Sequence, residues 1–128
     1  MEKQIALKSK NNKISISNGI IFIDVVPKAA IDLEETEALV HDIKMLSAGT
    51  KRPVLADIRK VTNLSSDSRS YLKQLDFLQE HICASAIVVH SPASKLIGSL
   101  FLGFLRPPYP IELFSNFDKA KKWCKRFI

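Results

Sequence analysis

The feature that most constrains the fold is an alternation of short apolar runs with longer segments of helical periodicity. Residues 13–17 alternate apolar and polar side chains, which is the period of a half-exposed strand. The pair Asn18-Gly19 follows and favours a two-residue hairpin turn, because both residues tolerate positive φ. A more apolar strand pattern covers residues 20–26, and residues 4–8 predict an additional edge strand. The chain therefore begins with antiparallel strands.

Four helical patterns and three buried strands are predicted after this hairpin. The first helix begins at Asp32, an acidic N-cap with Glu35 at its third position, and ends near Gly49, which accepts a left-handed conformation. The short apolar runs 53–57, 84–89 and 111–114 are typical of strands buried on both faces. The later helices are predicted from a cap within residues 65–68 through Ile82, over residues 94–105, and from Ser115 to the C-terminus.

This order of elements predicts an α/β fold in a single domain that spans residues 1–128. We expect a mixed, largely parallel sheet with an N-terminal hairpin, about four helices and right-handed crossovers. With 128 residues, 46% of them hydrophobic and 25% charged, the chain fits one globular domain. A chain of this length buries roughly two thirds of its unfolded surface on folding.

The positive charge lies at the two ends of the chain. Of the net charge of +6, residues 1–13 carry +3 and residues 117–128 carry +4, so the centre is close to neutral. A basic terminus can bind phosphate groups, or it can be the solvated face of a helix. Because these cations are not interleaved with aromatic side chains as in single-strand binders, no nucleic-acid partner is expected. No apolar run is long enough to span a membrane and no secretory signal is visible, so we expect a cytoplasmic protein.

Cysteines and histidines provide no recognisable metal motif. Cys83 and Cys124 are 41 residues apart and match neither zinc spacing nor a redox Cys-x-x-Cys motif. Both are expected to be buried small hydrophobes. The three histidines are scattered along the sequence. We therefore expect no metal and no cofactor.

Polar residues follow two of the predicted strands. Asp57 and Arg59 come after the strand over residues 53–57, and His90 follows the next strand. The carboxyl ends of parallel strands meet at one edge of a sheet, so these side chains could converge there, with a nearby serine completing a Ser-His-Asp set. The nucleophile elbow Gly-x-Ser-x-Gly and Gly-rich phosphate loops are absent from the sequence. An ion pair at the strand end is the simpler interpretation, and no enzymatic activity is expected.

The helix over residues 94–105 is more apolar than a surface helix requires. An amphipathic helix needs an apolar stripe of only about 100°. Leu96, Leu100, Phe101 and Phe104 are expected to face the sheet, which leaves other apolar side chains on other sides. Small residues Gly98, Ser99 and Gly103 permit close approach of another element, and Lys95 and Arg106 bracket the run, where they could meet anionic headgroups. The seven apolar residues are Leu96, Ile97, Leu100, Phe101, Leu102, Phe104 and Leu105.

Four interpretations of this apolar face remain open. It is covered within the chain, it forms the seam of a homodimer, it docks a partner protein, or it forms the wall of a pocket for an apolar ligand.

Three stretches in this order resemble the SpoIIAA-like fold, which includes STAS domains and the related CRAL-TRIO lipid-binding proteins. They are the first strands over residues 14–26, the strand, loop and helix over residues 54–67, and residues 91–104 followed by 111–115 and the Trp-bearing helix. The resemblance covers nearly the whole chain. It implies the sheet order. The third stretch is also similar to a group of small uncharacterised bacterial proteins of this fold.

In STAS antagonists of anti-sigma factors, the loop after this strand holds an Asp-Ser-Ser/Thr-Gly motif whose second hydroxyl is phosphorylated. On this chain the motif falls on Ser65, Ser66, Asp67 and Ser68, so a carboxylate occupies the acceptor position. A shift of one residue would place Ser66 or Ser68 there, at a helix N-terminus that favours an anion. The alternative is a serine-rich helix cap.

The resemblance implies a non-enzymatic regulatory or protein-interaction module. Its partner is a protein or a second copy of the chain, with a homodimer favoured, and its candidate surfaces are the loop of residues 65–68 and the apolar helix face. The alternative function is the CRAL-TRIO-like binding of a small apolar or lipid ligand.

Overall fold

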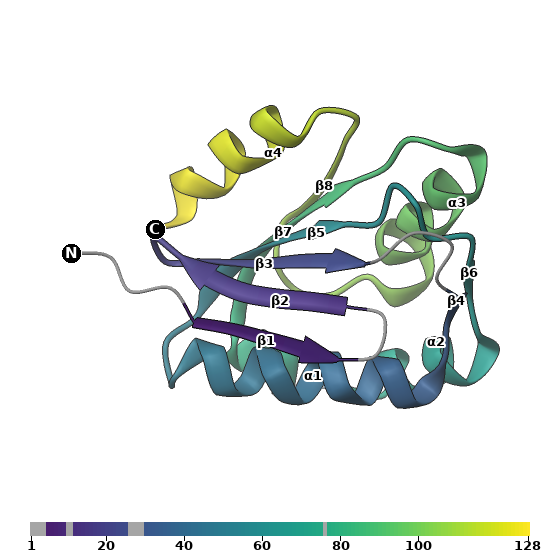
Figure 1. Cartoon of the computed structure of the whole chain (residues 1–128), viewed down its shortest axis with the longest axis horizontal. Helices are drawn as coiled ribbons and strands as arrows, with labels where there is room; N and C mark the ends of the chain where they lie inside the picture. Colours follow the sequence, from purple (N-terminus) through teal and green to yellow (C-terminus); the bar gives the residue numbers. More distant parts are fainter. Residues whose placement is uncertain (1–4, 10–11, 26–29, 76) are drawn as a thin grey trace.

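The centre of the molecule is a six-stranded mixed sheet in the order β1-β2-β3-β5-β7-β8 (Figure 1). The computed structural model describes residues 5–9, 12–25, 30–75 and 77–128. The pairs β1/β2 and β2/β3 are antiparallel, and the three following pairs are parallel, as predicted for the fold class. The strands are β1 (Ile5–Ser9), β2 (Asn12–Ser17), β3 (Ile20–Val25), β5 (Arg52–Asp57), β7 (Ile82–Val88) and β8 (Ile111–Phe114).

The predicted hairpin turn joins β2 to β3. Asn18 has a φ of 51° and Gly19 a φ of 82°, so both residues adopt the left-handed conformation that this turn requires. The edge strand predicted near residues 4–8 is β1, which pairs with β2. The sequence signals at the start of the chain are therefore confirmed.

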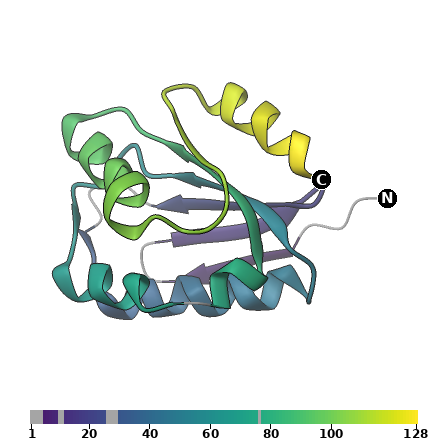
Figure 2. The same ribbon diagram turned by 180° about the vertical axis from the view of Figure 1, so that it is seen from behind.

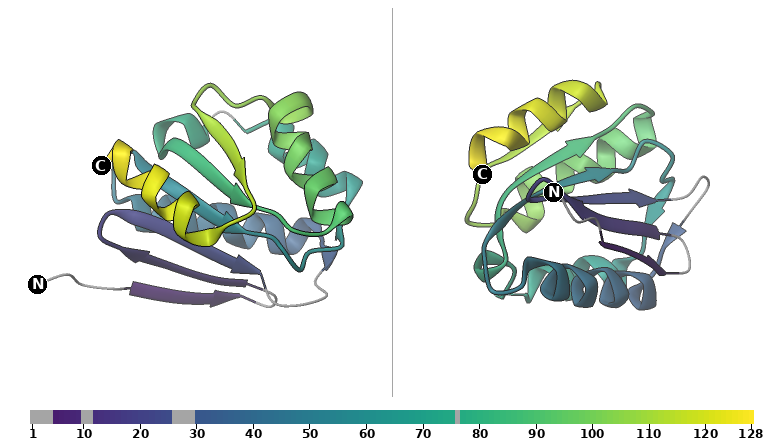
Figure 3. Two further views of the ribbon diagram at one scale, coloured as in Figure 1. Left: turned by 90° about the horizontal axis from the view of Figure 1, so that it is seen from above. Right: turned by 60° about the vertical axis from the view of Figure 1, so that its left-hand side comes forward.

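Helices cover both faces of the sheet, with α1, α2 and α3 on one side and α4 on the other (Figures 2 and 3). The helices are α1 (Leu33–Ser47), α2 (Ser66–Lys73), α3 (Pro92–Leu100) and α4 (Phe117–Cys124). Alternate residues of each strand supply the two cores: Ile21 and Ile23 join the cluster under α1 and α3, whereas Ile20 joins the cluster under α4. In the second cluster Ala120 and Cys124 are completely buried, as expected for the apolar face of the last helix.

Two helix ends differ slightly from prediction. Asp32 caps α1 as expected, since its side chain accepts a hydrogen bond of 2.9 Å from the amide of Glu35. The other end of α1 turns at Ala48, whose φ is 51°, before Gly49 takes the same conformation. The N-cap of α4 is Asn116 rather than Ser115, and it accepts from the amide of Lys119 at 2.9 Å.

The second helix is shorter than its periodicity predicts. It ends at Lys73, a short 3-10 helix η1 (Phe77–Glu80) follows, and Ile82 is the first residue of β7 rather than a helical residue. Ile82 pairs with Arg52 of β5 in the sheet. Leu78 still packs against the core from the 3-10 turn. The apolar spacing therefore predicts correctly that Leu78 packs against the core, but it predicts the wrong secondary structure for this segment. Strand pairing overrides local periodicity here.

A small second sheet escaped prediction. It consists of β4 (Ala30–Ile31) and β6 (Asn63–Leu64), which run parallel. Ile31 and Leu64 are buried, and the amide of Ser65 donates to the carbonyl of Ile31 at 3.0 Å. Strands of two residues carry no detectable period. This pair fixes the loop that leads into α2.

The core between the sheet and α1, α2 and α3 is incompletely filled. An apolar cavity of about 130 Å³ lies there. Its walls include Val54 and Ile87 from the sheet, Ile43 from α1 and Ile97 from α3. Space of this size is unusual, because protein interiors are packed about as densely as organic crystals.

Candidate functional site

The apolar helix is α3 continued by a π-helical turn, η2 (Phe101–Leu105). Ile97 and Gly98 face the sheet, whereas Leu96 is 69% exposed. The prediction that Leu96 faces the sheet is therefore wrong. The reason is the close approach at Gly98, where a β-carbon would lie 3.0 Å from Val89 Cγ1. This contact sets the rotation of the helix and turns Leu96 outward.

The outward face of this helix, which we call the α3 stripe, combines apolar, small and basic residues. Leu102 is 48% exposed, and it and Leu96 are the two large apolar side chains of the stripe. Leu100 and Phe101 are half-buried and pack against the core, as expected. The side chains of Phe104 and Leu105 lie outside those that the structure describes. The α3 stripe consists of the exposed residues Lys95, Leu96, Ser99, Leu102, Gly103 and Arg106.

The small residues of the helix divide between two roles. Gly98 is used within the chain, where it brings α3 against the sheet. A β-carbon at Gly103 would meet nothing within 4 Å, and Ser99 is also exposed. Ser99 and Gly103 thus leave room for another molecule to approach the α3 stripe closely.

Two serines of the predicted interaction loop form the cap of α2. The Ser65 hydroxyl accepts from the amide of Ser68 at 3.1 Å. Ser68 is completely buried, and its hydroxyl lies 3.0 Å from that of Ser65 and 2.9 Å from that of Thr36 in α1. The structure therefore provides the cap that the sequence allowed as an alternative. Between these serines, Ser66 and Asp67 are exposed, and of Ser66 and Ser68 only Ser66 is accessible to a kinase.

The loop and the α3 stripe lie at the same end of the molecule. In Figure 1, α2, α3, β4 and β6 gather at the end toward which β3 and β5 point. β6 packs against α3, and α2 packs against η2. This is the carboxyl edge of the parallel strands, where open α/β sheets commonly hold their ligands. Ser66 and Asp67 therefore lie beside the surface to which Leu96 and Leu102 belong.

The predicted strand-end polar group is only partly assembled. Arg59 forms a bidentate ion pair with Asp57, with Nη2 to Oδ2 at 2.7 Å and Nε to Oδ1 at 3.0 Å. Both residues line an open groove of about 530 Å³ beside α4, together with Asp24 and Lys121. His90 is exposed and does not line this groove. In the described part of the chain, no hydrogen bond joins the side chain of His90 to Asp57 or to a serine.

Electrostatics show that the Asp57 carboxylate is committed to Arg59. Burial alone would raise the pKa of Asp57, but the hydrogen bonds and positive charge of Arg59 hold this pKa below its usual value. A carboxylate held in this way stays ionised, and its two oxygens face a guanidinium rather than an imidazole. The geometry supports the ion-pair interpretation over a Ser-His-Asp set.

The described residues contain no cluster of three or more His, Cys, Asp or Glu side chains that could hold a metal ion. No helix found in those same residues has the length and apolarity that a membrane crossing needs.

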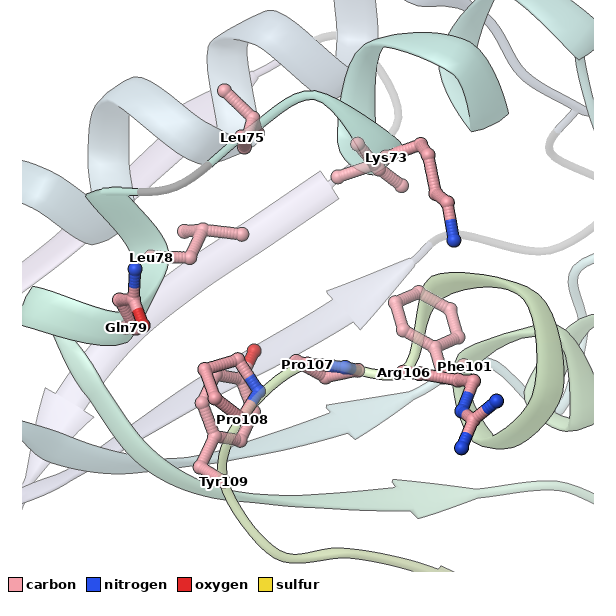
Figure 4. A pocket seen from close by; sticks show the side chains of 10 residues that line it. Lys73, Leu75, Leu78, Gln79, Phe101, Arg106, Pro107, Pro108 and Tyr109 are labelled. Carbon is pink, nitrogen blue, oxygen red and sulfur yellow. The ribbon is translucent and has the colours of Figure 1, made fainter.

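A second pocket, of about 280 Å³, opens next to the apolar cavity (Figure 4). Leu72, Leu78, Phe101 and Tyr109 line both spaces and form the wall between them. Arg106 and the helical apolar residues could be recognised from the sequence, but this pocket could not. Its remaining lining residues are Lys73, Leu75, Gln79, Arg106, Pro107 and Pro108.

Comparison with solved structures identifies the class of fold. A protein of the DUF3478 family with a SpoIIAA-like fold, from Shewanella loihica PV-4, superposes with a TM-score of 0.60 at 18% identity, covering 97% of this chain and 95% of that one. An anti-sigma factor antagonist from Mycobacterium paratuberculosis has a TM-score of 0.58 at 19% identity, covering 96% and 95%. At this identity the likeness shows the fold. The chain has the SpoIIAA-like fold of STAS domains.

The family follows from the sequence. A family model described as a domain of unknown function, DUF7793, matches residues 14–128, and the chain belongs to that family. Among curated proteins, none matches the sequence.

Proposed function

We propose that this chain is a non-enzymatic interaction module that binds a partner protein through the α3 stripe. The observation that carries the proposal is the outward position of Leu96 and Leu102, which are 69% and 48% exposed on the helix formed by α3 and η2. The antagonist from Mycobacterium paratuberculosis, which shares the fold, is named for its action on a protein, and that name supports a protein partner.

The charges on the stripe favour a partner with acidic groups beside an apolar segment. Lys95 lies at one end of the stripe and Arg106 at the other, with Leu96 and Leu102 between them. In a twofold dimer built on this face, these cations would meet each other or their own copies, and like charges at an interface oppose association. An acidic partner meets no such penalty. The homodimer expected from the sequence stays a prediction.

Site-specific photo-cross-linking in cells that naturally produce the chain tests this proposal. A photoreactive residue at Ser99 should form an adduct with a second protein, whereas the same residue at Met45 on α1 should not. Met45 is a matched control because it is exposed, at 57%, and lies on a different helix. The double variant Leu96→Glu and Leu102→Glu should abolish the adduct, and Met45→Glu should leave it unchanged.

Two results would overturn this assignment. An adduct with twice the mass of the chain, together with a dimer in sedimentation experiments, would replace the acidic partner by a second copy. Equal cross-linking from both positions, or none from either, would remove the α3 stripe as an interaction surface.

A second candidate function is supported by a different observation. The apolar cavity of about 130 Å³ inside the core could hold part of a small apolar ligand. Ligand binding inside the core requires space of this kind, because a completely filled core leaves no room. A thermal shift on addition of a small apolar compound would support this function, provided that filling the cavity by Ala56→Leu abolishes the shift.

A further inference from the structure

We propose that the cavity and the adjoining pocket together bind a small anionic amphiphile, with its apolar tail in the cavity and its charged group beside Arg106. The inference rests on the second candidate function and adds the entrance and the chemical class of the ligand. Four observations support it: the two spaces adjoin, the cavity presents no unpaired polar side chain, the pocket carries cations, and its backbone is strained at Arg106.

The connection between the two spaces consists of side chains alone. Leu72, Leu78, Phe101 and Tyr109 are half-buried and separate the cavity from the pocket. Figure 4 shows Leu78 and Phe101 around the pocket, with the Pro107–Tyr109 segment along one side of it. A ligand that passes between the spaces needs rotamer changes of such side chains and no movement of the sheet. Side-chain rotations of this kind take place far faster than the rearrangement of whole elements.

The interior of the cavity suits a hydrocarbon tail. Its polar side chains are Thr36, Ser85 and Tyr109, and each has a partner. Thr36 Oγ1 lies 2.9 Å from the carbonyl of Asp32 and 2.9 Å from Ser68 Oγ. Ser85 is hydrogen-bonded with the side chain of Tyr109. A polar ligand group placed inside would therefore lose its water without gaining a partner, which disfavours its burial.

The size of the cavity limits the tail. An engineered apolar cavity of about 150 Å³ in another protein holds benzene, so a space of about 130 Å³ suits a tail of about six carbons. The remainder of the ligand would occupy the pocket of about 280 Å³. Pockets that bind small molecules start at about 300 Å³, and the two adjoining spaces together reach that range.

The entrance is basic. Arg106 and Lys73 line the pocket. Figure 4 shows Lys73 extending from α2 toward the side of the pocket where Phe101 and Arg106 lie. A guanidinium matches the geometry of a carboxylate, so it favours this group over a neutral alcohol of the same chain length.

The backbone at the entrance is held in a costly conformation. The turn η2 is π-helical and closes with a bond of 3.0 Å from the amide of Arg106 to the carbonyl of Phe101. Arg106 itself has a φ of 41°, in the left-handed region that glycine normally occupies. π-helical turns and left-handed non-glycine residues both concentrate at functional sites. Here they place the cation of Arg106 at the pocket.

Binding of sodium octanoate and 1-octanol, measured by isothermal titration calorimetry and NMR, tests the proposal. Octanoate should bind about tenfold more tightly than octanol. The variant Arg106→Gln should remove most of this preference and leave octanol binding unchanged, and Arg106→Lys should retain part of it. The control Arg126→Gln changes an exposed arginine next to α4, which covers the opposite face of the sheet, and should have no effect.

Chain length and cavity filling test the position of the tail. From butanoate upward, affinity should rise about fourfold per added methylene and then level off once the cavity is full. Ala56→Leu, which adds volume inside the cavity, should weaken octanoate and octanol binding alike by at least tenfold. Thermal unfolding of this variant checks that it is folded, and Ala56→Val provides a smaller increase in volume should it not be.

These experiments distinguish a ligand that has the wrong charged group from a cavity that binds no ligand. Equal affinities for octanoate and octanol, both weakened by Ala56→Leu, would overturn the anionic class and leave apolar binding in place. If neither probe binds, or if Ala56→Leu leaves both affinities unchanged, both the inference and the second candidate function are overturned.

Discussion

The hydroxyl of Ser68 in α2 lies 2.9 Å from the hydroxyl of Thr36 in α1, 32 residues earlier in the chain. This hydrogen bond joins the N-terminal turns of the two helices. Ser68 also lies 3.4 Å from the carbonyl of Ile31. Both residues are buried. Buried hydrogen bonds therefore hold the serine-rich loop in place, and only its exposed residues are accessible to another molecule.

Replacement of Ser68 should cost stability that replacement of Ser66 does not. We expect Ser68→Ala to lower the free energy of unfolding by about 1–3 kcal/mol, because buried polar partners would lose a hydrogen bond. Ser66 is exposed, so Ser66→Ala should change this free energy by less than about 0.5 kcal/mol. Urea denaturation of both variants measures the difference. Equal losses would show that the Ser68 network contributes nothing specific.

Two glycines of the same helix should respond oppositely to a larger side chain. Gly98→Val should lower the free energy of unfolding by about 1–3 kcal/mol, because the added atoms would press on Val89 and Leu113 of the sheet. Gly103→Val enters open space and should be neutral within about 0.5 kcal/mol. Chemical denaturation of the two variants checks this. A stable Gly98→Val protein would contradict the close approach of α3 to the sheet.

The Cys124 thiol should be unreactive in the folded protein. Burial raises its pKa to about 12, against an ordinary value of 9.0, so the reactive thiolate is rare at neutral pH. At pH 8 an aromatic disulfide reagent should modify Cys124 only as fast as the chain opens. Mass spectrometry of the labelled protein measures this rate. Rapid modification of Cys124 without unfolding would contradict its burial.

The same thiol should make stability depend on alkaline pH. Above pH 9 the unfolded chain loses the Cys124 proton while the folded chain keeps it, so the free energy of unfolding falls as pH rises toward about 12. The Cys124→Ala variant lacks this contribution. The stability difference between wild type and variant should therefore narrow over this range in denaturation curves. A constant difference would show that the pKa is not raised.

The Asp57–Arg59 pair should matter more for titration than for stability. NMR of the Asp57 carboxyl carbon should give a midpoint below 3.8, because Arg59 favours the charged form. A lowered pKa supplies stability that is complete above pH 3.8 and is lost as pH falls through the folded midpoint. Since the Arg59 side chain is 41% exposed, Asp57→Asn should cost no more than about 1 kcal/mol. A midpoint above 3.8 would contradict the pairing.

Much of the fold could be predicted from the sequence because its signals are local. The turn at Asn18-Gly19, the cap at Asp32 and the apolar alternation of the strands each follow from the conformational limits of nearby residues. The sheet order is different, since periodicity fixes the type of an element but not its neighbours. Only a resemblance such as that to STAS domains can supply the neighbours of each strand, and the order β1-β2-β3-β5-β7-β8 is given by the structure.

The sites could be predicted only in part. The sequence indicated that residues 96–105 carry more apolar surface than a helix needs, and Leu102 is indeed exposed. The apolar pattern placed Leu96 on the wrong face. The rotation of α3 depends on the close approach of Gly98 to Val89 and Leu113, which lie outside this helix in the sequence. His90, which could have joined Asp57 and Arg59 at the strand end, is exposed and does not line the groove beside them.

The sequence by itself determined most of the strands and helices, since hydrogen bonding and steric limits act over a few residues. Tertiary structure alone decided where α2 ends and which side chains of α3 meet solvent. It also decided that an apolar cavity lies between the sheet and the helices, next to the pocket that Arg106 lines. These features depend on how whole elements pack, and packing sums small contacts between residues far apart along the chain.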